Sequence, residues 1–420
     1  MAGAAISRGL MLVAAVLVAR MLGKTGYGEL GMIQSTVGMF GVFAGFGLGL
    51  TATKHVAEFR RSDPARAGRI IALSWFVAIV TGGLMAVALL LFAPWLATHT
   101  INAPHLSGVL RIGALILFIS ALNGAQTGAL SGFEAFRTIA FVNLLVGLIS
   151  FPLLVGGARW GGLNGAVWAL AISLAVNWLL NHLVLRKEAR RYDVPFTFRH
   201  CRQEVAVLWR FSLPAVLSGA LVLPVNWVCR AFLVNRPDGY AEMGIFNAAE
   251  QWYGVMLFFP SLLGQVVLPV LSERLGQNEI GQSRRLLLLA MKMNALLVTP
   301  LVIVISIVSP YVMRLYGVGF ESGWPTLVMV LITAGLLAVQ TPVGQIIAAS
   351  GRMWTGFAMN LGWAVVFVVG TVLLIHRGSF GLATARAIGY VVHGTWTLAF
   401  AYCLIHEARG TNDRSLEPAF

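Results

Sequence analysis

The chain of 420 residues is 58% hydrophobic and only 11% charged, and its mean hydropathy is +0.81. Soluble domains are about 45–50% apolar and about 25% charged, so this composition excludes an ordinary soluble protein. The formal net charge of +14 could suggest a nucleic-acid partner, but such proteins carry their cations on a soluble face or tail, and this sequence has no soluble domain to hold one.

Twelve apolar stretches follow one another at nearly even spacing, and each is long enough for a helix that crosses the hydrocarbon core of a bilayer. We predict spans at about residues 5–23, 30–52, 70–97, 109–132, 138–157, 162–185, 208–235, 243–271, 286–310, 325–350, 353–375 and 381–405. The first stretch runs into Arg20 instead of a small-residue cleavage site, so we interpret it as a retained span. The sequence therefore predicts an all-α polytopic membrane protein.

Lysine and arginine are unevenly distributed between the two sides of these spans. If the N-terminus lies inside, only nine of the 30 fall on the outer side: Arg20, Lys24, Arg111, Arg159, Arg230, Arg236, Arg314, Arg377 and Arg386. Positive residues concentrate in the cytoplasmic loops of membrane proteins. We therefore predict that both termini are cytoplasmic, and topology alone explains most of the positive charge.

The longest connection, residues 186–207, lies in the middle of the chain and is strongly basic. It would join an N-terminal six-helix lobe (1–185) to a C-terminal one (208–405), which a cytoplasmic tail (406–420) follows. We interpret the linker as a topology determinant that also meets anionic headgroups of membrane lipids.

An internal repeat supports this division. Residues 26–34 (GYGELGMIQ) recur as residues 239–247 (GYAEMGIFN), and further matches follow at similar offsets: Glu58, Arg69, Gln126 and Asn143 correspond to Glu273, Arg284, Gln345 and Asn360. An even number of spans separates the copies, so both have the same orientation in the membrane. We predict two lobes related by an axis along the membrane normal, with a central cavity between them.

Several cations fall inside predicted spans, where a charge costs about 2.5–3.5 kcal/mol at mid-membrane. Arg20, Arg230 and Arg386 lie a few residues inside the outer ends of their spans, and Arg111 lies near the outer start of the fourth. These arginines could line a water-filled vestibule that binds a pyrophosphate or acidic sugars. Alternatively, their side chains extend to the outer headgroups.

Acidic residues are nearly absent from the spans, and only Glu250 lies clearly within one. An exporter of organic cations should carry several cavity acids as counter-charges, so this scarcity favours an anionic cargo without excluding a multidrug exporter. Glu250 is either a coupling site for a proton or sodium gradient or a structural partner of Arg230 or Arg386.

Other polar and small residues in the spans permit two interpretations each. The repeat-related Gln126, Asn143, Gln345 and Asn360 could bond neighbouring helices or contact sugar hydroxyls. The glycines 41, 45 and 49 form a small-residue face that allows close helix packing, or a flexible point. His393 is a helix-packing residue or a proton relay.

Nothing in the sequence predicts an enzyme. No connection could hold a catalytic domain, and there is no HExxH motif, no phosphate-binding glycine loop and no carboxylate pair in a loop. The cysteines (Cys201, Cys229 and Cys403) lack the spacing of a metal site or a disulfide framework. We therefore expect no metal, no cofactor and no nucleic-acid partner.

Residues 19–28 (ARMLGKTGYG) resemble the AR-x-LG-x-x-x-YG signature of bacterial polysaccharide (O-antigen type) flippases. These proteins belong to the multidrug/oligosaccharidyl-lipid/polysaccharide exporter superfamily. The segment Gly47-Leu48-Gly49, the pair Thr53-Lys54 before a basic loop, and Ser131-Gly132 followed by Asn143 fit the same pattern. The resemblance covers nearly the whole chain in span order, and it adds Lys54 to the cation candidates.

The resemblance implies transport of an undecaprenyl-pyrophosphate-linked oligosaccharide from the inner to the outer leaflet of the bacterial inner membrane. Proteins of polysaccharide assembly would be further partners. Members of the family often have two more C-terminal spans, so a chain of twelve leaves its branch open. The alternatives are a cation-coupled multidrug exporter and, less favoured, a membrane glycan polymerase.

Overall fold

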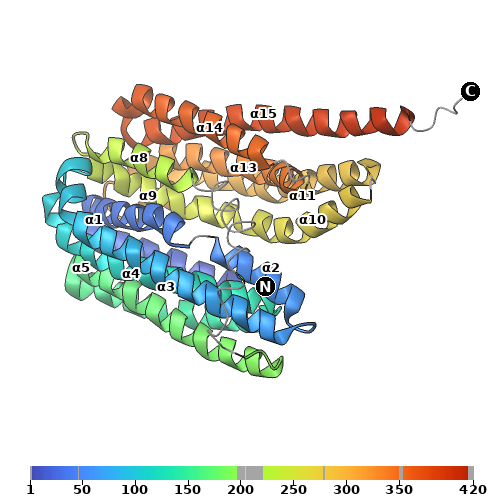
Figure 1. Ribbon diagram of the computed structural model, residues 1–420. Coiled ribbons are helices and arrows are strands. Elements are labelled where there is room, and N and C mark those ends of the chain that lie inside the picture. The colour runs from blue at the N-terminus through green and yellow to red at the C-terminus, as the bar shows by residue number, and fades with distance from the viewer. Residues whose placement is uncertain are drawn as a thin grey trace, which may run out of the picture. The chain divides into compact units, whose positions relative to one another are not determined.

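The structure is a computed structural model that describes residues 2–45, 47–195, 204, 221–277, 280–349 and 353–414 (Figure 1). Its long helices are α1 (Ala2–Gly45), α2 (Leu48–Phe59), α3 (Pro64–Trp95), α4 (Ser107–Gly132), α5 (Phe136–Arg191), α8 (Val222–Val234), α9 (Gly239–Met256), α10 (Phe258–Gly276), α11 (Ile280–Ile307), α13 (Trp324–Ala349), α14 (Met353–Leu374) and α15 (Gly378–Arg414). The short helices are η1 (Leu96–Thr100), η2 (Pro104–Leu106), α12 (Ser309–Arg314), η5 (Glu321–Gly323) and η6 (Ile375–Arg377). No strand occurs in these described ranges.

Seven helical stretches of the described chain are long and apolar enough to cross a membrane, which confirms the all-helical polytopic class. Three of them, with 40, 56 and 50 residues, are longer than one crossing of about 20 residues requires. A glycine with positive φ interrupts each of them: Gly23 (φ 68°, ψ 179°) in α1, Gly162 (φ 54°, ψ −136°) in α5, and Gly378 (φ 61°) at the start of α15. Glycine adopts such angles without the steric cost that a Cβ adds.

Two predicted spans are wrong as continuous helices. The stretch 30–52 is divided between α1 and α2, and Gly47 before α2 has a left-handed backbone (φ 62°, ψ 11°). The stretch 243–271 is divided between α9 and α10 at Leu257. Pro260 explains this break, because its ring clashes with the carbonyl four residues earlier, and that residue, Met256, ends α9.

The predicted linker 186–207 begins as helix, because α5 continues to Arg191. Half of the linker, the first part of the predicted span 208–235 and the last residues of the tail 406–420 lie outside the described residues. The division into lobes at 185 and 208 stays a prediction.

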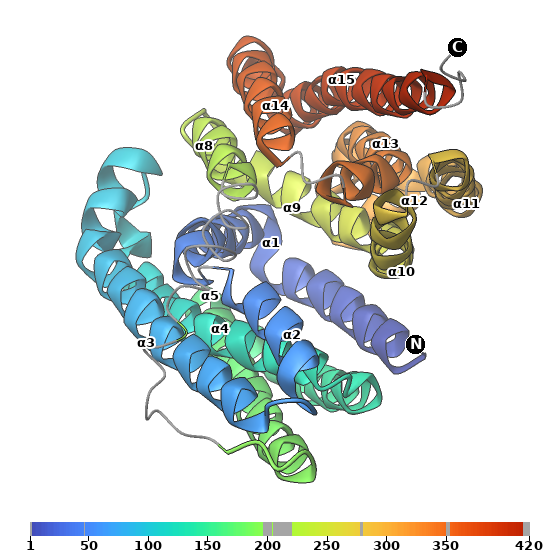
Figure 2. The ribbon, with the colours of Figure 1, turned by 45° about the vertical axis from the view of Figure 1, so that its right-hand side comes forward.

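The chain forms two compact units, residues 1–244 and 245–420. In the first unit, α4 contacts α1, α2, α3 and α5 and so occupies the centre (Figure 2). A buried core joins α2, α3, α4 and α5 and includes Val56, Ile71, Leu130 and Leu185. In the second unit, α13 contacts α10, α11 and α15, and α14 packs on α15.

Local structure repeats along the chain as the sequence does. Gly378, at an offset of 216 from Gly162, has nearly the same backbone angles (φ 61°, ψ −140°). The 3-10 helices η2 and η5 directly precede α4 and α13, each of 26 residues. Asn123 on α4 donates to the Leu174 carbonyl of α5, as Gln340 on α13 donates to the Tyr390 carbonyl of α15, both at 3.1 Å. The offsets of these two pairs are 217 and 216, so each half carries the same internal hydrogen bond.

Candidate functional site

An ion pair lies inside the second unit, between α9 and α15. The Nη1 atom of Arg386 donates to Oε2 of Glu250 at 2.7 Å. The Arg386 side chain is 3% exposed and that of Glu250 is 22% exposed. The guanidinium also lies over the rings of Phe246 and Tyr253, at 5.1 and 4.7 Å from their centroids. The carboxylate and the two aromatic faces together stabilise a cation that is almost removed from solvent.

This ion pair bears on the roles predicted for Glu250 and Arg386. The sequence left open whether Glu250 pairs with Arg230 or with Arg386, and the structure joins it to Arg386. The carboxylate of Glu250 therefore balances the charge of Arg386. Of the two side chains, that of Glu250 is the more exposed to solvent. The roles of Arg386 in cargo binding and of Glu250 in coupling stay predictions.

The other predicted cations lie on four helices of the first unit. Arg20 on α1, Lys54 on α2 and Arg111 on α4 are exposed, and Arg230 on α8 is half-buried. Arg20 precedes the break at Gly23 by three residues, so it lies at the end of the first helical segment of α1. Exposure fits both an aqueous vestibule and a headgroup contact, and both interpretations remain.

The polar residues that the repeat relates differ in their surroundings. Gln126 is fully buried, and with its amide oriented to satisfy both groups it donates to the Trp178 carbonyl (3.1 Å) and accepts from the Trp178 indole (3.2 Å). It therefore bonds α4 to α5. Gln345 on α13 and Asn360 on α14 are half-buried, whereas Asn143 on α5 is exposed.

Close packing accounts for one of the glycines in the predicted small-residue face. Gly49 on α2 lies so close to Gly128 on α4 that a Cβ on Gly128 would overlap the Gly49 backbone, whereas a Cβ on Gly49 would lie 3.2 Å from the Gly124 carbonyl oxygen. A Cβ on Gly41 would make ordinary contact with Leu117, and one on Gly45 would meet no atom within 4 Å. His393 is half-buried, with its ring 6.4 Å from that of Tyr390.

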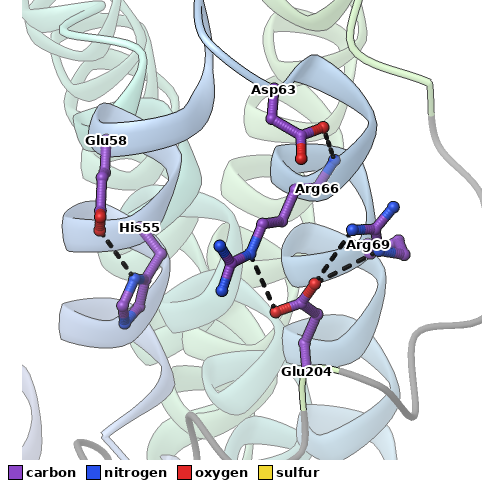
Figure 3. A network of polar contacts seen from close by, with 6 residues as sticks. All are labelled: His55, Glu58, Asp63, Arg66, Arg69 and Glu204. Atoms are coloured by element: carbon purple, nitrogen blue, oxygen red, sulfur yellow. Dashed lines mark hydrogen bonds and ion pairs between the residues drawn. The ribbon is translucent and has the colours of Figure 1, made fainter.

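A charged network at α3 was not predicted (Figure 3). Glu204, which is 6% exposed, accepts from Nε of Arg66 at 3.2 Å and from Nη2 of Arg69 at 3.1 Å. Asp63 accepts from the backbone N–H of Arg66 at 2.9 Å and so caps α3. The network fastens part of the predicted linker to α3. A signal was present, because Glu204 is one of three acids in the basic linker 186–207.

Both copies of the repeated glycine–tyrosine motif meet within the first unit. Gly28 on α1 lies against the Tyr240 carbonyl, and Gly244 lies against the Lys24 carbonyl, with no room for a Cβ at either glycine. The Tyr240 hydroxyl donates to the Ile101 carbonyl at 2.8 Å. Burial, with a smaller effect of the Glu29 carboxylate, raises the pKa of Tyr240, so this hydroxyl stays protonated as a donor.

The family described as "Polysaccharide biosynthesis protein" matches residues 1–274, well over half of the chain. The chain belongs to this family. Among its relatives is the EPS I polysaccharide export inner membrane protein EpsE of Ralstonia nicotianae, 26% identical over 395 residues that cover 92% of this chain and 88% of the relative. The lipid III flippase of Escherichia coli is 23% identical over 271 residues, 63% of each chain.

Solved structures show the same fold. An inward-facing multidrug resistance MATE family transporter of the MOP superfamily has a TM-score of 0.79 at 16% identity, covering 96% of this chain and 95% of that one. The lipid II flippase MurJ in an inward closed conformation has a TM-score of 0.71 at 14% identity, covering 95% and 86%. The relatives and solved structures named here are exporters, transporters and flippases, not enzymes, which disfavours the glycan polymerase alternative for this family member.

Proposed function

We propose that this protein is a flippase that moves an oligosaccharide linked to undecaprenyl pyrophosphate from the inner to the outer leaflet of the bacterial inner membrane. The cargo would serve surface polysaccharide assembly. The observation that carries the proposal is the relation, over nearly the whole chain, to a polysaccharide export protein, together with the more partial relation to a lipid III flippase.

The proposed architecture has twelve crossings in two six-helix lobes around a central cavity. The stretches of 40, 56 and 50 residues would each cross twice, which gives six crossings, and α3, α4, α11 and α13 would each cross once. Residues 208–235 and the broken pair α9–α10 would supply the last two. The cation distribution supports cytoplasmic termini, and alternating access would open the cavity to each side in turn.

The balance of charges supports an anionic cargo. Arg20, Arg111, Arg230 and Lys54 are candidates for binding the pyrophosphate or acidic sugars, since arginine presents a rigid fork of donors to phosphate. The alternative, a cation-coupled multidrug exporter, needs an acid as counter-charge for an organic cation. Glu250, the span acid, already balances Arg386 at 2.7 Å.

Deletion of the gene should cause the lipid-linked glycan to accumulate in the inner leaflet and surface polysaccharide to disappear. A drug exporter would instead leave the polysaccharide intact and change only sensitivity to cationic compounds. Measurement of both in one deletion strain, complemented with the intact chain, separates the two functions.

Arg20→Gln and Arg230→Gln should each lower polysaccharide export in the complemented strain by roughly 10–100-fold. A hydrogen bond to a charged group contributes about 1.5–3 kcal/mol, and each 1.4 kcal/mol corresponds to a factor of ten. Arg159→Gln is the matched control, because Arg159 is an exposed cation on α5 that is not a candidate. Wild-type export in both variants would assign these arginines to headgroup contacts.

We further propose that a proton or sodium gradient drives transport, with Glu250 as the candidate coupling residue. The double variant Glu250→Gln/Arg386→Gln removes both charges of the pair, so no uncompensated charge is left buried. Export by this variant should lose its dependence on the ion gradient. An unchanged dependence would exclude Glu250 from coupling.

A further inference from the structure

A histidine lies between two tryptophan rings inside the first unit. His182 on α5 is half-buried, and its ring centroid is 5.3 Å from that of Trp75 on α3. It stacks on Trp178, one turn earlier on α5, at 5.6 Å and an interplanar angle of 15°. Gln126 on α4 uses the indole N–H of Trp178, which fixes this ring against its neighbours.

Unsatisfied buried polar atoms occur at this histidine and elsewhere in the same helix bundle. Its Nδ1 atom is buried and has no hydrogen-bond partner in the described part of the chain. The same is true of the Trp75 indole nitrogen, the Ser173 hydroxyl and Oδ1 of Asn123, all on α3, α4 or α5. Each buried polar group without a partner costs about 1–3 kcal/mol, so four in one helix bundle require a reason. Of these atoms, the Trp75 indole nitrogen is a donor on a ring that contacts His182, and Nδ1 of His182 can itself carry a proton.

In the described part of the chain, no carboxylate is paired with His182. Arg186, one turn further along α5, is the charged side chain that acts on the ring among the described residues. The elements packed against it contribute the indole of Trp75 from α3 and the amide of Gln126, through Trp178, from α4. Glu250 differs, because Arg386 pairs with its carboxylate at 2.7 Å.

Two features of these surroundings act on the protonated ring in opposite directions. Arg186 repels a second cation, whereas an imidazolium ion on two indole faces gains about 0.5–2 kcal/mol through cation–π contact. Histidine is the side chain whose ordinary titration falls near physiological pH. The predicted span ends at residue 185, so the ring lies close to the cytoplasmic boundary, where water can deliver a proton.

We propose that His182 is a reversible proton-binding site of this transporter. A hydronium ion gives its proton to the imidazole, and water takes it back, with no other bond changed. The added charge at the contact of α3, α4 and α5 shifts the balance between conformations that differ in how they stabilise it. Only this link to transport rests on the proposed function, and proton binding itself does not.

Tryptophan emission of the purified full-length protein in detergent, recorded between about pH 5 and 8, should fall reversibly as the pH is lowered. A protonated imidazole quenches a stacked indole, whereas the neutral ring does so weakly. His182→Gln should abolish this step. His393→Gln is the matched control, since it removes the half-buried histidine of α15, and it should keep the step.

An unchanged emission step in His182→Gln would overturn the proposal. If that variant fails to elute as a single folded species, the double variant Trp75→Phe/Trp178→Phe keeps the histidine and removes its two reporters. Loss of the step then supports the site, and its persistence contradicts it. The measurement uses no cargo, so its failure leaves the export results in the deletion strain untouched.

Discussion

Glu250→Gln should lower the thermal stability of the purified protein more than Arg386→Gln does. The first change leaves a guanidinium that is 3% exposed without its counter-charge, and arginine cannot lose its proton to escape this state. The second leaves a carboxylate that is 22% exposed and therefore keeps more contact with water. Removing one partner of a buried pair costs about 3–5 kcal/mol, and we expect the glutamate variant to bear the larger loss.

The double variant Glu250→Gln/Arg386→Gln should recover most of this stability, because replacing both charges of a buried pair is often nearly neutral. The midpoint of thermal unfolding in detergent, detected by size-exclusion chromatography, gives the stability of all three variants. Arg377→Gln is the control, since Arg377 is an exposed cation just before α15. Equal losses in the two single variants, or a double variant no better than the worse single one, would contradict this account.

Hydropathy predicted the positions of the single helices well. The predicted span 109–132 corresponds to α4 at Ser107–Gly132, and the boundary between the spans 138–157 and 162–185 falls at Gly162. The bilayer sets the length of an apolar helix, so composition along the chain locates it. A glycine at a boundary then supplies the angles that a tight reversal needs.

Contacts between helices could not be predicted in this way, because they depend on the rotation of each helix about its axis. The repeat makes Gln126 and Gln345 equivalent in sequence, yet one is fully buried and the other half-buried. Hydropathy places Glu250 in a span but does not choose Arg386 over Arg230 as its partner. His182 gave no signal, because Trp75 comes from a distant part of the chain.

Gly28→Ala should strongly destabilise the first unit. An alanine Cβ would overlap the Tyr240 carbonyl and the Gly244 backbone nitrogen, so α1 and the start of α9 would have to separate. Overpacking against side chains costs about 1–3 kcal/mol, and we expect a loss at the upper end because backbone atoms cannot move aside as a side chain can. Gly244→Ala, whose Cβ would overlap the Lys24 carbonyl, should cost a similar amount.

Gly38→Ala is the control on the same helix, and its effect should have the opposite sign. A Cβ at Gly38 would meet no atom within 4 Å, and alanine favours a helix interior over glycine by about 1 kcal/mol. Thermal unfolding of the three single variants and of Gly28→Ala/Gly244→Ala measures the change in stability that each substitution causes. The double variant should lose less than the sum of its parts, since the first substitution already separates the helices that the second would push apart. Additive losses would mean that the two copies of the motif pack independently.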